Sequence, residues 1–280
     1  MVSRRGFLAV GSASLAAGSR LLGAEAEAAK KIPIGLQLYS VRGDCAKDFP
    51  GTVEAVAKMG YKGVDFAGYY GWDKKPAEFR KLLDDNGLRC CGCHTGLGTL
   101  QGDTLKRTVE LHKALGNKFL IVPGGIGGKT KESWLEAAKM FNEIAEKLKA
   151  YDMLCGYHNH AHEFHKFSED SPETPWDVFF SNTAPEVVMQ LDVGNGMGGG
   201  CDPVATLKKF PGRARTIHAK GFRGILGSEA DKAPWPDIFA LCETTGKTEW
   251  YIVEEDGAGK LPPLETVKQA IENLKKMGKA

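Results

Sequence analysis

The stretch Leu154-Cys155-Gly156-Tyr157-His158-Asn159-His160-Ala161-His162-Glu163 is the part of the chain from which its fold and its chemistry can first be inferred. It begins as a short apolar run typical of a buried strand and ends in alternate histidines followed by a carboxylate. Residues two apart in a strand point to the same face, so His158, His160 and His162 would converge if the strand ran that far. Alternate imidazoles beside a glutamate favour a divalent metal such as Zn, Mn, Ni or Fe, and a polar loop is the alternative.

An apolar strand followed by an amphipathic helix recurs eight times with no linker. The predicted strands cover residues 34–38, 64–67, 88–93, 119–122, 154–160, 187–192, 216–220 and 250–254. The predicted helices cover residues 50–59, 76–85, 103–115, 131–150, 176–180, 203–210, 236–244 and 263–277. Eight such units in about 250 residues predict a parallel sheet closed into a single-domain (β/α)8 TIM barrel. An open doubly wound sheet is the alternative, but residues 37–42 are not the Gly-rich phosphate loop that it needs.

Residues 1–30 are predicted to be an export signal that precedes the barrel at 31–280. The pair Arg4-Arg5 stands before a small, apolar run at 9–22, and the alternating alanines at 24–28 offer cleavage sites. The paired arginines resemble a twin-arginine signal, so we expect a periplasmic protein. The apolar run is too short and too rich in Gly and Ser to span a bilayer well, so no stable membrane insertion is expected after signal removal.

Charge and cysteine content exclude some classes of protein. The net charge of +2 does not favour a nucleic-acid partner. Seven cysteines without a repeated spacing argue against a disulfide scaffold, and most are expected to be small buried hydrophobes. Cys91 and Cys93 are predicted to share a strand face, and His112 is expected to be solvated in the middle of a helix. A homo-oligomer stays an open alternative.

Polar side chains end seven of the eight predicted strands, where a barrel of this type carries its catalytic groups. They are Gln37, Asp65, His94, His158 with His160, Asp192, His218 with Lys220, and Glu254 with Glu255. A His, Asp, His and Glu set on the fifth to eighth strands is typical of a divalent metal site. Two members have structural alternatives, since Asp192 could cap the next helix and His218 could be a satisfied core histidine.

Six of these stretches resemble the sugar phosphate isomerase/epimerase family of xylose isomerase-like barrels. They are Gly35–Arg42, Val64–Tyr69, Tyr157–His160, Leu191–Asn195, His218–Lys220 and Val253–Asp256. The resemblance covers essentially the whole mature chain and implies one divalent ion, often Mn, with Zn, Co, Ni, Fe and Mg as alternatives. It carries the family's Asp, His and Glu ligands over to Asp192, His218 and Glu254. Many relatives have Glu where this chain has His158, which indicates an exported branch that bears the Tyr157–His160 motif.

The activity that the resemblance implies is isomerisation or epimerisation of a free sugar, keto-sugar or polyol. A proton next to a carbonyl would be removed through a metal-bound enediolate. His158 is expected to complete the metal ligands, and Glu254 could also act as a base. His160 is expected to shuttle protons, and Lys220 to stabilise developing negative charge.

Six side chains are candidates for binding a small carbohydrate substrate: Gln37, Asp65, His94, Asn195, Lys220 and Glu163. Glu163 is also an alternative ligand, because a bend after His160 could bring it to the place of His158. No phosphate clamp is evident, since Gly124–Lys129 lacks the spacing of a P-loop. A metal-dependent lyase or dehydratase on a keto-sugar or keto-glycoside is the main alternative function. A non-catalytic sugar-binding barrel and a metal-dependent nuclease are the others.

Overall fold

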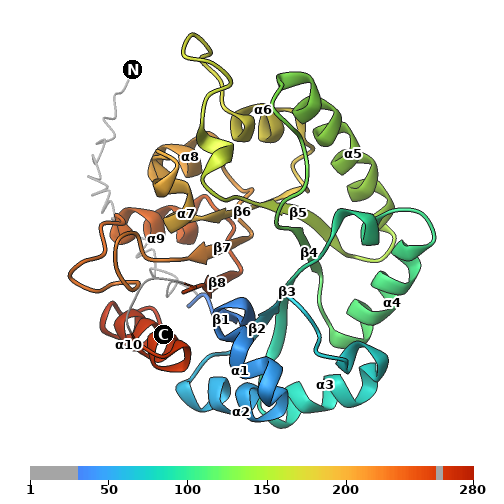
Figure 1. The fold of residues 1–280 in the computed structure, drawn as a ribbon, viewed down its shortest axis with the longest axis vertical. Coiled ribbons are helices and arrows are strands. Elements are labelled where there is room, and N and C mark those ends of the chain that lie inside the picture. The colour runs from blue at the N-terminus through green and yellow to red at the C-terminus, as the bar shows by residue number, and fades with distance from the viewer. Residues whose placement is uncertain (1–30, 257–260) are drawn as a thin grey trace, which may run out of the picture. The chain divides into compact units, whose positions relative to one another are not determined.

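Eight parallel strands close into a barrel in strict sequence order, and helices surround them (Figure 1). The structure is a computed structural model that describes residues 31–256 and 261–280. The strands are β1 (Ile34–Gln37), β2 (Gly63–Phe66), β3 (Arg89–His94), β4 (Phe119–Val122), β5 (Leu154–His158), β6 (Val188–Asp192), β7 (Thr216–Ala219) and β8 (Trp250–Val253). The predicted (β/α)8 TIM barrel is therefore confirmed. The expected export signal at residues 1–30 lies outside the described residues.

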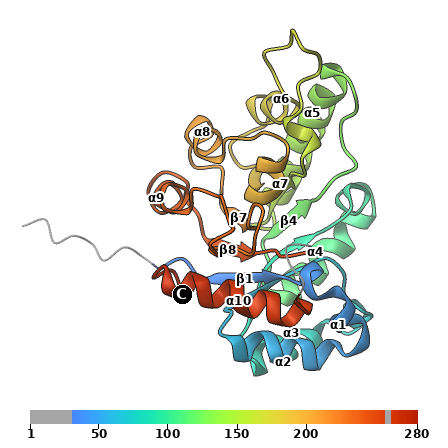
Figure 2. The ribbon, with the colours of Figure 1, turned by 60° about the vertical axis from the view of Figure 1, so that its left-hand side comes forward.

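All eight predicted helices are present, with bounds within two residues of those expected. The helices are α1 (Arg42–Lys47), α2 (Phe49–Met59), α3 (Pro76–Asp85), α4 (Thr104–Leu115), α5 (Lys131–Lys149), α6 (Pro175–Asn182), α7 (Val193–Gly198), α8 (Pro203–Lys209), α9 (Trp235–Thr244) and α10 (Pro263–Lys276). Figure 2 shows α10 beside β1, which pairs with β8 to close the barrel. The short helices α1 and α7 were not predicted. Three glycines give α7 a low helix propensity, and it forms where Asp192 caps its first turn.

Local signals set the lengths of the other helices. Helix α2 begins after Asp48, whose side chain accepts a hydrogen bond from Gly51 N at 3.0 Å. It ends at Gly60, and α4 ends at Gly116, with φ angles of 105° and 69°. Residues other than glycine adopt such left-handed angles only with strain, so these glycines end the helices and return the chain to the next strand.

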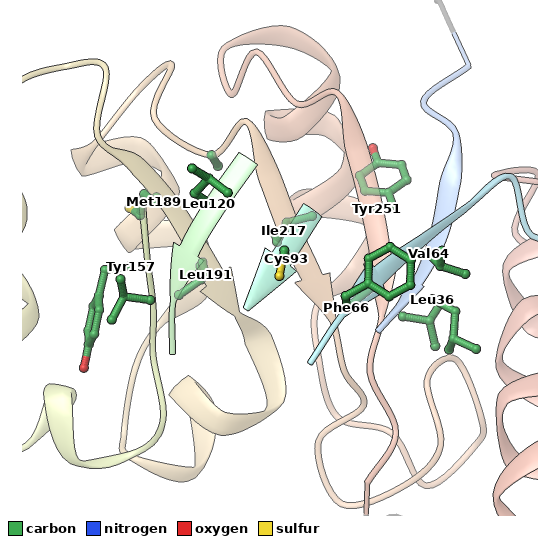
Figure 3. Close-up of a cluster of buried hydrophobic side chains, with 14 of the residues drawn as sticks. Leu36, Val64, Phe66, Cys93, Leu120, Tyr157, Met189, Leu191, Ile217 and Tyr251 are labelled. Atoms are coloured by element: carbon green, nitrogen blue, oxygen red, sulfur yellow. The ribbon is translucent and has the colours of Figure 1, made fainter. Parts of the chain in front are cut away.

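The strands have two differently packed faces. Their outward side chains form the main core beneath the helices, and Figure 3 shows Leu36, Phe66, Tyr157, Leu191 and Tyr251 among them. A second buried cluster fills the barrel toward the amino-terminal ends of the strands with Cys91, Phe119, Ile121, Val188, Trp250 and Ile252. Because side chains alternate along a strand, the inward positions beyond this cluster face the carboxyl end of the barrel. Those positions are polar, and they build the site described below.

A bulge in β3 changes the expected alternation. Val64 pairs with Cys90 but Asp65 pairs with Gly92, so the register slips by one residue at Cys91. Cys91 joins the inner cluster whereas Cys93 joins the outer core, and the prediction that they share a face is therefore wrong. The slip lets the strand deliver His94 to the inside.

All seven cysteines are free, and all except the half-buried Cys201 are buried, as expected for small hydrophobes. Burial is the main cause that raises the pKa of Cys45, Cys155 and Cys242 to about 12. The prediction that His112 is solvated is wrong, because its ring is fully buried between α4 and the barrel. Within residues 31–256 and 261–280, no helix is long and apolar enough to cross a membrane.

Candidate metal centre

Four side chains from β5 to β8 meet at the carboxyl end of the barrel, and we call them the ligand cluster. They are His158, Asp192, His218 and Glu254, and one donor atom from each lies within 4.8 Å of the others. Strand pairing explains the meeting, because His158 aligns with Gln190, and Asp192 aligns with His218. All four residues are buried. The structure thus brings together the four residues predicted as metal ligands.

The two oxygens of Asp192 have different environments. Oδ1 accepts a hydrogen bond from Asn195 N at 2.7 Å and so caps α7. Oδ2 is buried, and no group in the described part of the chain bonds to it. A buried acceptor without a partner costs about 1–3 kcal/mol, and more if it is charged. The cap and the ligand interpretations are therefore compatible, and the unpartnered oxygen fits a cation.

His218 lies between two carboxylates. Its Nε2 is 3.1 Å from Asp65 Oδ2, and its Nδ1 is 2.8 Å from Glu254 Oε2. Burial disfavours the charged ring, but the hydrogen bonds to Asp65 and Glu254 outweigh this and raise the pKa of His218 to about 9. A metal-binding histidine is often supported from behind by a carboxylate, and Asp65 lies where it could support His218 in this way.

His94 and His158 share one acceptor. Gln190 Oε1 is 2.8 Å from His94 Nε2 and 3.2 Å from His158 Nδ1. Burial lowers the pKa of both imidazoles, and the neighbouring His218 lowers that of His158 further. Both rings are therefore neutral near pH 7, the form in which histidine binds metals. Gln190 was not predicted as a site residue, although it stands two residues before Asp192 on the same inward face.

Glu254 and Lys220 form the charged side of the site. Burial alone would raise the pKa of Glu254. The hydrogen bond to His218 and the charge of that ring nevertheless hold the pKa of Glu254 well below its usual range. Lys220 Nζ lies 3.4 Å from Glu254 and 2.5 Å from Asp256, and these anions with Asp192 raise its pKa despite burial. The neighbouring Glu255 points elsewhere and accepts a hydrogen bond from Leu226 N at 2.7 Å. This settles which of the two adjacent glutamates faces inward.

A cavity of about 640 Å³ opens above the ligand cluster. Its wall includes Tyr39, His94, His158, His160, Glu254 and Asp256. The volume and the mixture of rings and charges suit a small polar molecule.

Strand β5 is shorter than predicted. It stops at His158 because the Asn159 amide bonds to both backbone groups of Asp192, accepting from N at 2.8 Å and donating to O at 3.0 Å. The three alternate imidazoles consequently do not converge. His160 lies with its ring 5.3 Å from that of His158, and the side chain of His162 is 64% exposed.

Glu163 is not brought to the ligand cluster or to the cavity wall. Its buried carboxylate accepts hydrogen bonds from Tyr157 hydroxyl at 2.8 Å and from His160 N at 2.9 Å. Because Tyr157 points outward into the core, Glu163 lies outside the barrel. It therefore neither replaces His158 nor reaches a substrate in this structure.

Three other predicted substrate-binding residues have supporting positions. Gln37 is fully buried, and its Oε1 accepts a hydrogen bond from Tyr39 N at 3.1 Å. Asp65 is fully buried behind His218 rather than on the cavity wall. Asn195 is half-buried in α7, where its backbone N–H donates a hydrogen bond to the capping side chain of Asp192. Of the residues predicted to contact substrate, His94 lines the cavity. Lys220 does not line it but lies next to Glu254, which does.

The fold and this site define a xylose isomerase-like barrel, and comparison with known sequences agrees. Residues 53–277 match the family described as "Xylose isomerase-like TIM barrel". The chain belongs to that family. Enzymes named as a dehydratase, an isomerase/epimerase and an epimerase are similar to this chain.

The similar proteins cover different shares of the chain. An inosose dehydratase from Clostridium tetani is 30% identical over 195 residues, which span 62% of this chain and 64% of that protein. A sugar phosphate isomerase/epimerase structure from Parabacteroides distasonis has a TM-score of 0.76 at 25% identity, covering 89% of this chain and 95% of that one. A structure of L-ribulose 3-epimerase has a TM-score of 0.65 at 15% identity and covers 89% and 94%, so it shows the fold alone.

Proposed function

We propose that the chain is a divalent-metal-dependent sugar isomerase or epimerase. Its substrate would be a free sugar, a keto-sugar or a ketone derived from a polyol. The observation that carries the proposal is the ligand cluster, in which one donor atom from each of four residues lies within 4.8 Å of the others, together with the unpartnered Oδ2 of Asp192. The adjoining cavity of about 640 Å³ is large enough for a small sugar.

The ligand cluster would hold the ion. When bound, a divalent cation supplies electrophilic stabilisation of the negative charge that develops as a carbon next to a carbonyl loses its proton. The donor set contains two imidazoles and two carboxylates, which suits Mn, Fe, Co, Ni or Zn. Lys220 adds a positive charge beside Glu254, at 3.4 Å.

Glu254 and His160 are the proton-transfer groups in this proposal, since both line the cavity. The low pKa of Glu254 keeps it ionised, and its second oxygen can receive a proton from a substrate carbon. His160 is exposed at the cavity and can exchange a proton with water. A positioned acid or base of this kind contributes roughly 10²- to 10⁴-fold to the rate.

A metal-dependent lyase or dehydratase is the second candidate, and the imidazole at the end of β5 favours it. The family resemblance implies a glutamate at this position, which would supply a second carboxylate base. With Glu254 as the single carboxylate base, loss of a neighbouring hydroxyl competes with reprotonation on the opposite face. The similarity to an inosose dehydratase supports the same candidate and adds inososes to the substrates to be tested.

The experiment that separates these reactions is incubation in D2O. The purified protein is loaded in turn with Mn, Co, Zn or Ni and given ketoses, inososes and 3-keto-glycosides. Deuterium at a retained C–H bond is expected for an isomerase or epimerase, and an unsaturated product for a dehydratase. If no metal and substrate pair gives either product, the proposal fails.

Two matched variants locate the chemistry. His160→Gln should lower the rate of exchange by roughly 10²-fold or more without releasing metal, because His160 is outside the ligand cluster. His162→Gln is the control, since His162 is a neighbouring exposed imidazole with no place in the cavity wall. Equal rates in the two variants would remove His160 from the mechanism.

A further inference from the structure

The Gln190 side chain is in hydrogen-bond contact with four other side chains of the site. It is fully buried on the inward face of β6, and both the oxygen and the nitrogen of its amide have hydrogen-bond partners. Its Oε1 faces His94 Nε2 at 2.8 Å and His158 Nδ1 at 3.2 Å. Its Nε2 donates to Thr216 Oγ1 at 3.1 Å and, more weakly, toward Asp65 Oδ2 at 3.5 Å. Side chains from four other strands, β2, β3, β5 and β7, therefore meet around one amide on β6.

The chemistry of Asp65 determines which way the amide points. Oδ2 of Asp65 already faces His218 Nε2 at 3.1 Å as a hydrogen-bond acceptor, so the group of Gln190 that faces this oxygen is the NH2 group. The reversed amide would set two oxygens against each other. The amide oxygen is therefore the atom that faces the two imidazoles, and this orientation does not rest on the placement of the atoms alone.

An amide oxygen is an acceptor with two lone pairs, and each lone pair here faces an imidazole nitrogen. Both nitrogens must therefore carry hydrogen. A neutral imidazole has a single N–H, so the remaining lone pair of His158 is on Nε2 and that of His94 is on Nδ1.

We propose that Gln190 is a positioning residue that fixes the tautomers of His94 and His158. His158 is thereby left with Nε2 as its metal-binding atom. His94 is left with Nδ1 as an acceptor, so it recognises a substrate group that donates, such as a hydroxyl. This inference rests on the proposed function for the metal and the substrate, but the tautomers themselves belong to the metal-free protein.

The first test is an NMR experiment on the metal-free protein. Long-range 1H–15N spectra distinguish a protonated, pyrrole-type nitrogen from an unprotonated, pyridine-type nitrogen in each imidazole. We expect the pyrrole type at Nδ1 of His158 and at Nε2 of His94. The opposite tautomer in either ring would overturn the inference, whatever the variants below do.

Two substitutions separate tautomer control from simple filling of space. Gln190→Met keeps the volume but removes the acceptor, so both rings should show mixed tautomers and the Kd for Zn²⁺ should rise about 10- to 100-fold. Gln190→Glu keeps an acceptor oxygen for both imidazoles but replaces the NH2 group that faces Asp65 by a second oxygen, so it should preserve the wild-type tautomers only when that oxygen is protonated. Met189→Leu, which changes an outward-facing neighbour on the same strand, is the control and should change neither readout.

The outcomes are distinct for the inference and for the proposed function. Wild-type tautomers in Gln190→Met would show that Gln190 does not fix them. Failure of the wild-type protein to bind Zn²⁺ in calorimetry would instead contradict the proposed metal centre, and the tautomer assignment would still be decided by the spectra.

Discussion

Each oxygen of Asp192 can be tested separately, because Oδ1 caps α7 and Oδ2 is unpartnered. Asp192→Asn retains an acceptor for the cap but loses the charge, so we expect near-normal stability and loss of metal binding. Asp192→Ala loses both, and the missing cap should cost a further ~1 kcal/mol of stability. Metal content measured on the purified variants and urea unfolding check the two effects. Normal metal content in Asp192→Asn would show that the site has been misplaced.

Asp65 should influence the metal without touching it. Its hydrogen bond to Nε2 of His218 keeps Nδ1 directed at Glu254, so Asp65→Asn should weaken metal binding by about 10- to 100-fold. Calorimetric titration with Zn²⁺ and Mn²⁺ measures the change. Asp73→Asn, at an exposed position in the 3-10 helix Trp72–Lys74, is the control. An unchanged Kd in Asp65→Asn would mean that Asp65 is only part of the core.

At this scale, strand ends were sufficient to predict the ligand cluster. Asp192, His218 and Glu254 each follow an apolar run, and a parallel barrel collects such positions at one end. The role of Asp65 could not be predicted, because it depends on contact with a histidine 153 residues away. Gln190 was missed for the same reason, since its partners come from β2, β3, β5 and β7.

Among the elements, long helices were predicted well because each has its own start and stop signals. Strand β5 was not, since nothing local shows that the Asn159 side chain will take over the backbone groups of Asp192. The same contact decides that only one of the alternate histidines of this stretch lies on the strand. The β3 bulge was equally invisible, because a register slip is a property of two strands and not of one.

Helix α4 carries a buried histidine whose titration should affect stability. His112 Nδ1 accepts from Asn117 Nδ2 at 3.0 Å, its Nε2 lies 2.9 Å from Tyr69 hydroxyl, and burial lowers its pKa to about 4. The unfolded chain binds this proton near pH 6.5 and the folded chain only near pH 4, so the unfolded state binds more protons between these values. The contribution of neutral His112 to the free energy of unfolding is therefore fully present above pH 6.5. The free energy of unfolding should fall by about 3 kcal/mol as the pH drops toward 4.

Urea unfolding at pH 7.5 and pH 4.5 measures this loss. His112→Gln removes the titrating group and should reduce the difference between the two pH values, whereas His165→Gln, in an exposed position, should leave it unchanged. An identical pH dependence in wild type and His112→Gln would refute the assignment.

At the scale of the whole barrel, metal binding should stabilise the folded state. The ligand cluster ties together four consecutive strands, β5 to β8, and an ion that binds only the folded state adds to its stability. Zn²⁺ at 100 times its Kd should contribute about 2.7 kcal/mol. For a barrel of this size the Tm should rise by roughly 5–10 °C.

A chelator should reverse this shift, and Asp192→Asn should abolish it. Differential scanning calorimetry with and without Zn²⁺ gives the measurement. A Tm that rises equally in the wild type and in Asp192→Asn would indicate binding somewhere other than the ligand cluster.

The rate at which the buried cysteines react with alkylating reagents should report how often the barrel opens. Thiols attack alkylating reagents as thiolates, and a pKa of about 12 leaves Cys155 and Cys242 almost wholly protonated and enclosed while the chain is folded. They react only during excursions that separate a strand from its covering helix. Alkylation rates therefore report how often each part of the barrel opens, with Cys155 for β5 and Cys242 for α9.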